Sequence, residues 1–394
     1  MPEEGPPRPE KREKRFTHEF EAIVDEDVDD LGDDQVEQAW EVFKRNFFSR
    51  RTLIFAGAFV VLVLAFFYVV LPQLPSLQKS LDTVRNDGDR SWLFVAFCME
   101  LLSYASYIWF FRAMFLEKIP VIGWIGSYRI SMAGVAATRL FGAAGAGGIA
   151  LTFWAVRKAG MGRRMSVSYL VAFYVILYAL FMITLVVDGV LLRTHVFPGA
   201  APFGVTVVPA IFAGIVISIF VLALAIPGNL ERLAARWSTG RGRAARIAEK
   251  AAAVPALIGH GTRVAVTFVR SGNPGLLGAV GWWAFDIATL WACFKAFGLA
   301  PELSVLVMGY FVGMIFNIIP TPGGVGPVEG GMIGAYAAFG IDWGLATAAV
   351  LAYRLFAFLM PTIPGVIAFI RLRGTVSSWQ EATATIQSKV TAEA

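Results

Sequence analysis

The stretch Asn317-Ile-Ile-Pro320-Thr-Pro322-Gly323-Gly324-Val-Gly326-Pro327-Val-Glu329-Gly330 interrupts an apolar segment that runs over residues 303–340. Proline removes a backbone donor and clashes with the preceding helical turn, so the three prolines of this stretch break a helix. Backbone that leaves a helix at membrane depth persists only where protein or a water-filled cavity satisfies its polar groups. The segment is therefore predicted to form two short helical arms around a break.

The composition of the whole chain is that of a membrane protein. Apolar residues make up 57% of the 394 residues, charged residues 16%, and the mean hydropathy is +0.62. Soluble domains are about half apolar and a quarter charged. The apolar residues fall into runs of about 20, which cross the hydrocarbon core at ~1.5 Å per residue. The sequence predicts an all-α polytopic membrane protein with six full transmembrane helices, at residues 53–71, 91–115, 167–192, 205–226, 274–297 and 345–370.

A second broken apolar stretch covers residues 120–158. Its glycines Gly145 and Gly147 align with Gly324 and Gly326 at an offset of 179 residues, and each broken stretch follows two spans and precedes one. A unit of three crossings plus a returning hairpin has odd parity, so its second copy must be inverted. The sequence thus predicts two re-entrant or broken helical hairpins in an inverted-topology repeat. This arrangement is typical of transporters whose binding site lies between the broken elements.

Close helix packing is the alternative explanation of both glycine-rich breaks. Gly309 and Gly313, like Gly330 and Gly334, have the spacing of small residues that lets helices approach. The prolines favour a true break in the second hairpin, whereas the first hairpin leaves both explanations open. The residues predicted to form the two breaks are Gly145, Gly147, Pro320, Pro322, Gly323, Gly324, Gly326 and Pro327.

Charge divides the chain into unlike parts. Residues 1–50 hold 15 of the 29 acidic residues and 8 of the 34 basic ones, which leaves a membrane body with 26 basic and 14 acidic residues. Because Lys and Arg gather in cytoplasmic loops, the alternation of basic and non-basic loops predicts that both termini are cytoplasmic. The predicted divisions are an acidic tail at 1–51 that ends in an interfacial helix, repeat 1 at 52–200 with its hairpin at 120–158, repeat 2 at 201–372 with a basic linker at 227–272 and its hairpin at 303–340, and a tail at 373–394.

Ionisable residues inside apolar spans are costly and mark candidate sites. Glu329 follows the Pro327 break, and Arg354 in the last span is within reach as its counter-ion. Arg139 precedes the first break, and Asp286 lies in the middle of a span. We expect Arg139 or Arg354 to hold an anionic headgroup while the carboxylates balance or relay charge, close to the positive end of the helix after Pro327. The alternative is an ion pair of Glu329 with Arg354 that only fixes helix register.

Signals for a cofactor, a metal or a catalytic site are poor. The run at 145–150 matches a dinucleotide-binding pattern by letter, but it lacks the preceding strand and the acidic residue about 20 positions later. Three widely separated histidines and two cysteines inside apolar runs form no metal-ligand spacing. No basic-aromatic stripe indicates nucleic acid. We therefore expect no cofactor, no metal, no nucleic-acid partner and no enzymatic activity.

The stretch at 317–330 resembles the signature of the lysylphosphatidylglycerol synthase transmembrane region and of the stand-alone flippase-like proteins built from it. In that signature Asn, Pro, Pro-Gly-Gly-x-Gly and Glu follow one another, and an Arg comes one span later. The matching residues are Asn317, Pro320, Pro322, Gly323, Gly324, Gly326, Glu329 and Arg354, and the resemblance covers roughly residues 50–372. The predicted substrate-binding residues are thus Arg139, Asp286, Asn317, Glu329 and Arg354.

The resemblance implies translocation of a lipid across a prokaryotic cytoplasmic membrane, with aminoacylated phosphatidylglycerol or a polyprenyl-linked glycan as candidate substrates. The soluble aminoacyl-transferase domain of the synthases is missing, so lipid synthesis by this chain alone is not expected. Two departures from the family pattern concern the breaks. Pro327 stands where a less rigid residue is common, and the first hairpin lacks the usual proline.

The sequence favours a flippase-like transporter whose partners are membrane lipids. A non-catalytic scaffold that binds envelope biosynthesis enzymes through the acidic tail and basic linker is a second class. A membrane-embedded enzyme acting on lipid headgroups is a third, and the lack of a nucleophile or metal set disfavours it. The resemblance also makes a homo-oligomer a candidate assembly.

Overall fold

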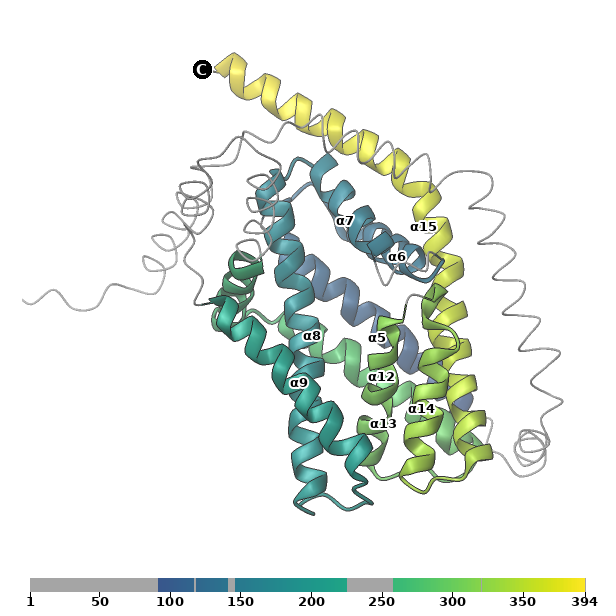
Figure 1. Cartoon of the computed structure of the whole chain (residues 1–394). Helices are drawn as coiled ribbons and strands as arrows, with labels where there is room; N and C mark the ends of the chain where they lie inside the picture. Colours follow the sequence, from purple (N-terminus) through teal and green to yellow (C-terminus); the bar gives the residue numbers. More distant parts are fainter. Residues whose placement is uncertain (1–90, 117, 141–145, 225–257, 320, 394) are drawn as a thin grey trace, which may run out of the picture.

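The computed structural model describes residues 91–116, 118–140, 146–224, 258–319 and 321–393, and every regular element among them is helical (Figure 1). The longer helices are α5 (Ser91–Phe115), α6 (Trp124–Leu140), α7 (Ala146–Lys158), α8 (Arg163–Arg193), α9 (Phe203–Leu224), α12 (Leu276–Phe297), α13 (Leu303–Ile315), α14 (Pro327–Ala338) and α15 (Trp343–Glu393). Two short 3₁₀ turns, η3 (Phe316–Ile318) and η4 (Pro322–Gly324), lie between α13 and α14. Residues 258–270 are also helical.

Five of the described helices are long and apolar enough to cross a membrane. They are Ser91–Phe115, Arg163–Arg193, Phe203–Leu222, Leu276–Phe297 and Trp343–Leu372. Each matches one of the six predicted spans to within a few residues, so the prediction of an all-helical multi-pass membrane protein is confirmed. The sixth predicted span (53–71) and the N-terminal tail lie outside the described residues, as does most of the predicted linker.

Helices α5 and α12 pack against each other through the middle of the protein (Figure 1). Trp92 meets Trp291 edge to face, with ring centroids 5.1 Å apart. At the other end of the pair Gly275 packs on Ala113, so the two helices run antiparallel. A Cβ added at Gly278 would lie 2.6 Å from the carbonyl oxygen of Ser106. Small residues thus set this close crossing, as they do between helices in lipid.

The two predicted hairpin segments form two antiparallel helix pairs in different parts of the bundle. Figure 1 shows α6 and α7 in its upper half and α13 and α14 in its lower half. Gly309 packs on Tyr336 and Gly313 on Met332, whereas a Cβ added at Gly334 would meet nothing within 4 Å. Close packing therefore explains Gly309 and Gly313 of α13 but not Gly330 and Gly334 of α14.

A non-helical segment separates α13 from α14, as the prolines predict. Ile319 is extended (ψ 122°), the conformation favoured for a residue before proline. Gly323 (φ 61°) and Gly326 (φ 94°) adopt positive φ angles that suit glycine. Pro327 then occupies the first position of α14, where a missing N–H costs nothing. Of the predicted break residues, Gly145 and Pro320 lie outside the described residues.

The last helix extends beyond the predicted span. The sequence analysis ends this span near residue 370 and starts a separate tail at 373, but α15 continues to Glu393. Beyond the predicted span, Trp379 packs on Gly126 of α6, and Arg129 donates a hydrogen bond to the Thr375 hydroxyl. The arginines after residue 370 mark the edge of the apolar segment rather than a helix end, and no proline follows to stop the helix.

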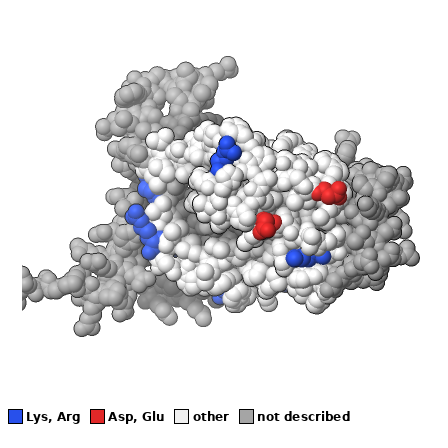
Figure 2. All heavy atoms as spheres, turned by 90° about the horizontal axis from the view of Figure 1, so that it is seen from below, with Lys and Arg blue, Asp and Glu red and all other residues white. Residues whose placement is uncertain are grey.

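The two ends of the bundle differ in charge. Several basic residues gather where α5 ends and between α7 and α8, namely Arg112, Lys118, Arg157, Lys158, Arg163 and Arg164. The lower end in Figure 1 carries the α8–α9 and α14–α15 connections. Seen from below in Figure 2, its described residues are mostly uncharged, with isolated acidic and basic side chains.

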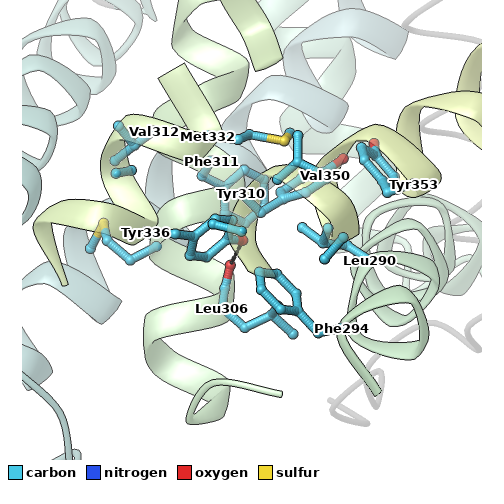
Figure 3. Close-up of a cluster of buried hydrophobic side chains, with 14 of the residues drawn as sticks. Leu290, Phe294, Leu306, Tyr310, Phe311, Val312, Met332, Tyr336, Val350 and Tyr353 are labelled. Carbon is cyan, nitrogen blue, oxygen red and sulfur yellow. Dashed lines mark hydrogen bonds between the residues drawn. The ribbon is translucent and has the colours of Figure 1, made fainter. Parts of the chain in front are cut away.

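Each helix pair belongs to its own apolar core. One core is built mainly by α12 to α15 with parts of α8 (Figure 3), and the other mainly by α5 to α8 with the end of α15. In the first core the Tyr336 ring lies 5.0 Å from that of Phe294, and its hydroxyl donates to the Leu306 carbonyl at 2.8 Å. A buried phenol that keeps a partner in this way fixes the position of α14 against α13.

The glycine contacts predict opposite effects of two alanine substitutions. Gly313→Ala overlaps Met332, so we expect a loss of about 1–3 kcal/mol, as for other overpacked sites. Gly334→Ala is its matched control, because it adds a helix-favouring methyl group in open space, worth up to about 1 kcal/mol. Thermal unfolding in detergent, followed by tryptophan fluorescence, measures both. Equal effects of the two substitutions would contradict the packing argument.

Candidate substrate-binding site

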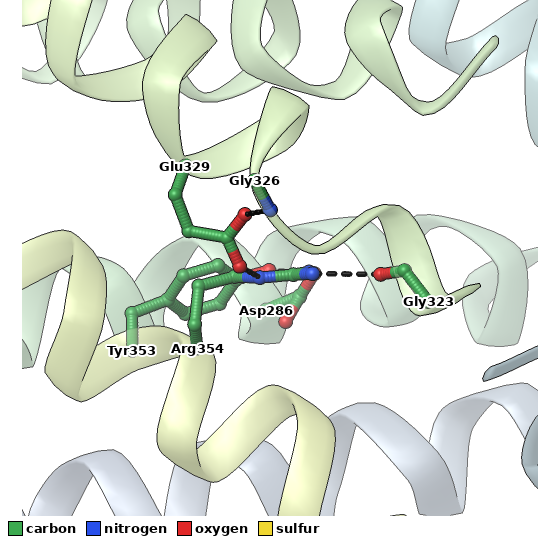
Figure 4. A network of polar contacts seen from close by, with 6 residues as sticks. All are labelled: Asp286, Gly323, Gly326, Glu329, Tyr353 and Arg354. Atoms are coloured by element: carbon green, nitrogen blue, oxygen red, sulfur yellow. Dashed lines mark hydrogen bonds and ion pairs between the residues drawn. The ribbon is translucent and has the colours of Figure 1, made fainter. Parts of the chain in front are cut away.

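A buried ion pair secures the non-helical segment between α13 and α14. The Nε of Arg354 lies 2.6 Å from Oε1 of Glu329, and the two side chains are 7% and 10% exposed. Arg354 also donates from Nη2 to the Gly323 carbonyl at 2.7 Å. Figure 4 shows the guanidinium reaching between Glu329 and this carbonyl. The ion pair expected from the sequence is therefore present, and it joins α14, α15 and the segment before α14.

Glu329 also caps its own helix. Its Oε2 accepts a hydrogen bond from the Gly326 N–H at 2.7 Å, and a carboxylate at this position is stabilised by the positive end of the helix. The sequence analysis expects the N-terminus of α14 to face a substrate, but in the structure Glu329 interacts with this helix end. Arg354 is likewise engaged, because its charge and two of its donors have partners within the protein.

Asp286 of α12 lies close to this ion pair, in a cluster of tyrosines (Figure 4). Its Oδ2 accepts hydrogen bonds from the hydroxyls of Tyr310 and Tyr353, the latter at 3.0 Å. Glu100 of α5 is only 1% exposed and interacts electrostatically with Asp286 and with Arg139. Two carboxyl groups from the central helix pair therefore share one buried polar cluster.

Arg139 is the cation with spare hydrogen-bonding capacity. It lies at the end of α6, and its Nη2 donates to the Tyr104 hydroxyl at 2.6 Å. Tyr104 in turn donates to the Ala357 carbonyl at 3.1 Å. The guanidinium carbon is 5.9 Å from the ring centres of Tyr104 and Phe358. Its Nη1 is buried and has no hydrogen-bond partner among the described residues.

The end of α6 meets the segment between α13 and α14 at this place. A Cβ added at Gly323 would lie 3.3 Å from the carbonyl oxygen of Arg139, so the end of α6 touches the segment between α13 and α14. The fold brings Arg139, Asp286, Glu329 and Arg354 together from four different helices. Asn317, the fifth predicted residue, lies in η3 and contacts Gly324 through its amide oxygen.

A cavity of about 1000 Å³ opens beside these residues. Its polar wall includes Arg139, Asp286, Asn317, Thr321 and Arg354, whereas Glu329 is not among the lining residues. Its apolar wall is formed by α8 and α9, with Leu170, Val171, Ile183, Ile217, Phe220 and Val221. One cavity thus joins a charged end to a long apolar surface.

The helix at residues 258–270 closes part of the cavity with Ile258, Thr262 and Val266. Burial and the positive charges of Arg164 and Arg263 lower the pKa of His260 on the same helix. His260 is therefore neutral near pH 7, and it adds no positive charge to this part of the protein.

Comparison with known proteins identifies the family to which the chain belongs. The family model of the lysylphosphatidylglycerol synthase TM region matches residues 53–365, most of the chain. The chain belongs to this family. A UPF0104 membrane protein of Methanothermobacter thermautotrophicus is 31% identical over 150 residues, which cover 38% of this chain and 43% of that protein. Another UPF0104 membrane protein, from Methanocaldococcus jannaschii, is 30% identical over 90 residues, 23% of this chain and 27% of that protein. The chain thus matches less than half the length of these curated relatives.

In this member of the lysylphosphatidylglycerol synthase TM family, the sequence analysis missed the tyrosines of the site. Tyr104 follows Glu100 by four residues and so lies on the same face of α5, which is a signal in the sequence. Tyr353 directly precedes Arg354. Tyr310 has no comparable signal, because its partner Asp286 comes from another helix.

The ion pair predicts strong coupling between two substitutions. Because each side chain is buried, we expect Glu329→Gln or Arg354→Met alone to destabilise the protein by about 3–5 kcal/mol. The double substitution should cost clearly less than the sum, since it leaves no uncompensated buried charge. Unfolding in mixed micelles measures all three variants. Additive losses would show that the pair contributes nothing as a pair.

Proposed function

We propose that the protein moves an anionic or aminoacylated phospholipid, or a polyprenyl-linked lipid, between the leaflets of a prokaryotic cytoplasmic membrane, without chemistry on the lipid. The observation that carries this proposal is the cavity, which has Arg139 at its polar end and the apolar residues of α8 and α9 along its wall. A phosphate oxygen is a strong acceptor for a guanidinium. The Nη1 of Arg139, which has no hydrogen-bond partner among the described residues, offers it a donor.

The apolar wall suits the lipid tail. Helix α9 lines the cavity with Ile217, Phe220 and Val221. It also exposes Ile211, Ile215 and Ile219 at 56–58%, as a helix in contact with the bilayer would. A headgroup can therefore lie at Arg139 while its acyl chains stay beside α9 in hydrocarbon.

An inverted repeat of two re-entrant hairpins is part of this proposal. Adding 179 to the residue numbers of α6 gives 303–319, which coincides to within one residue with the range 303–318 of α13 and η3. The same shift changes the range of α8 to 342–372, which coincides to within one residue with the span at Trp343–Leu372. Ser103 donates to the carbonyl of Trp282, its own counterpart 179 residues later, at 2.8 Å. The antiparallel α5 and α12 are counterparts as well, which is the relation that inversion requires.

We further propose that both termini are cytoplasmic. Support comes from the basic residues between α7 and α8 and from the largely uncharged opposite face (Figure 2). Membrane lipids are then the principal partners. A homo-oligomer and an association with envelope biosynthesis enzymes are additional proposals. The scaffold function differs from the transport function in that it leaves the charges of the cavity dispensable.

Leaflet exchange in proteoliposomes tests the transport function. We expect the purified protein to accelerate exchange of headgroup-labelled phosphatidylglycerol, its lysyl ester or a polyprenyl phosphate. Arg139→Gln should slow exchange about tenfold or more, because a hydrogen bond to a charged group is worth about 1.5–3 kcal/mol. Arg193→Gln is the matched control, since Arg193 is exposed at the end of α8.

Two results would contradict the proposal. Folded protein that accelerates exchange of none of the three lipids would favour the scaffold function. Equal rates for Arg139→Gln and Arg193→Gln would show that lipids cross elsewhere.

A further inference from the structure

We infer that Glu100 and Asp286 form a proton-binding carboxyl pair that takes up one proton when an anionic headgroup binds Arg139. This inference rests on the proposed transport function and deepens it, since it names the ion that accompanies the lipid. The pair lies at the contact of α5 and α12, next to the cavity, and sequence reasoning gave its two members no joint role.

The geometry makes the two carboxyls unlike each other. Asp286 accepts hydrogen bonds from Tyr310 and Tyr353, which favours its charged form. Glu100 has an Oε2 that is buried without a hydrogen-bond partner among the described residues. A carboxylate oxygen left in that position is costly, whereas a protonated Glu100 can donate a hydrogen bond to the neighbouring Asp286 carboxylate. The first proton of the pair therefore belongs on Glu100.

Every charged or titratable neighbour of the pair can be named, and few of them carry charge. Tyr104, Tyr310, Tyr353 and Cys293 surround it and are neutral as phenols and a thiol. Arg354 also faces Asp286, but its charge is balanced by Glu329. Among the residues that the structure describes, this leaves one cation, Arg139, against the two carboxyls.

The sum of these charges shows why binding of a headgroup is coupled to uptake of a proton. With Glu100 protonated, Asp286 ionised and Arg139 positive, the empty site is neutral, the least costly state for buried groups. A monoanionic headgroup on Arg139 makes the total negative by one. Protonation of Asp286 restores neutrality. Because Asp286 lines the cavity, its carboxylate can take this proton from cavity water, and it returns the proton when the headgroup leaves.

Infrared difference spectroscopy tests the pair without any transport assay. The purified full chain in lipid bilayers should show the C=O stretch of a protonated carboxylic acid at neutral pH, and Glu100→Gln should remove a part of it. Asp188→Asn on α8 is the matched control, since Asp188 is a second buried carboxyl with an oxygen that has no hydrogen-bond partner in the part of the chain that the structure describes. It should remove its own band and leave that of Glu100. If Glu100→Gln leaves the wild-type spectrum unchanged, the proton site is refuted, whatever the protein transports.

Leaflet exchange at several pH values tests the coupling. Exchange of phosphatidylglycerol should accelerate on acidification by up to about tenfold per pH unit, the limit for one proton. Exchange of zwitterionic phosphatidylcholine, if it occurs, should not depend on pH. Asp286→Asn should abolish the pH dependence, and Asp188→Asn should keep it.

The outcomes separate the two proposals. A pH-independent exchange of phosphatidylglycerol in wild type overturns the coupling but leaves the flippase intact. An absence of all exchange, together with the Glu100 band, overturns the proposed transport and the coupling built on it, and leaves only the carboxyl pair. If Asp286→Asn does not fold, Tyr353→Phe is the second variant. It removes one of the two donors that hold Asp286 charged, so it should shift the pH midpoint upward.

Discussion

The structure depends on hydrogen bonds to a few backbone N–H and C=O groups that have no partner within a helix. Between α13 and α14 the chain leaves α-helical geometry inside an apolar bundle, where an unpaired carbonyl or N–H is costly. Arg354 supplies the donor for the Gly323 carbonyl, and Glu329 supplies the acceptor for the Gly326 N–H. A buried ion pair by itself offers little net stability. This pair is favourable because each partner also completes the backbone of the same break.

This arrangement decides which residues remain available to a substrate. The two charges that the sequence makes most conspicuous, Glu329 and Arg354, are engaged in structure. Next to them, Nη1 of Arg139 and Oε2 of Glu100 are buried without a hydrogen-bond partner among the described residues. The contact of Gly323 with the Arg139 carbonyl places this group beside the ordered break. The side chains engaged in the break thus lie next to the side chains that have hydrogen-bonding capacity to spare.

Much of this could be predicted from the sequence, because its strongest signals are local. The spans follow from the length of apolar runs, the break from Pro322, Gly323 and Pro327, and the ion pair from two opposite charges in otherwise apolar segments. Although Tyr353 directly precedes Arg354, the contacts of Tyr310 and Tyr353 with Asp286 could not be predicted, since both tyrosines reach it only through the crossing of three helices. The continuation of α15 was missed because hydropathy reports the membrane edge and not the helix end. The sequence also could not show that Gly313 packs against Met332 while Gly334 faces open space, because this difference depends on tertiary contacts.

The balance of charge in the cavity bears on which headgroups it can distinguish. One cation and two carboxyls cannot all be charged at low cost in an apolar bundle. A phosphate alone restores balance only with an added proton, whereas a headgroup that carries both a phosphate and an ammonium brings its own positive charge. Such a headgroup could place its phosphate at Arg139 and its ammonium towards Asp286, with no second proton. A lipid esterified with an amino acid of uncharged side chain combines one phosphate with one ammonium, so the same cluster would accept it without a proton and a simple anionic lipid with one, whereas the two ammonium groups of a lysyl ester would leave the cluster positive by one. Selectivity in this site would then depend on total charge more than on the shape of the headgroup.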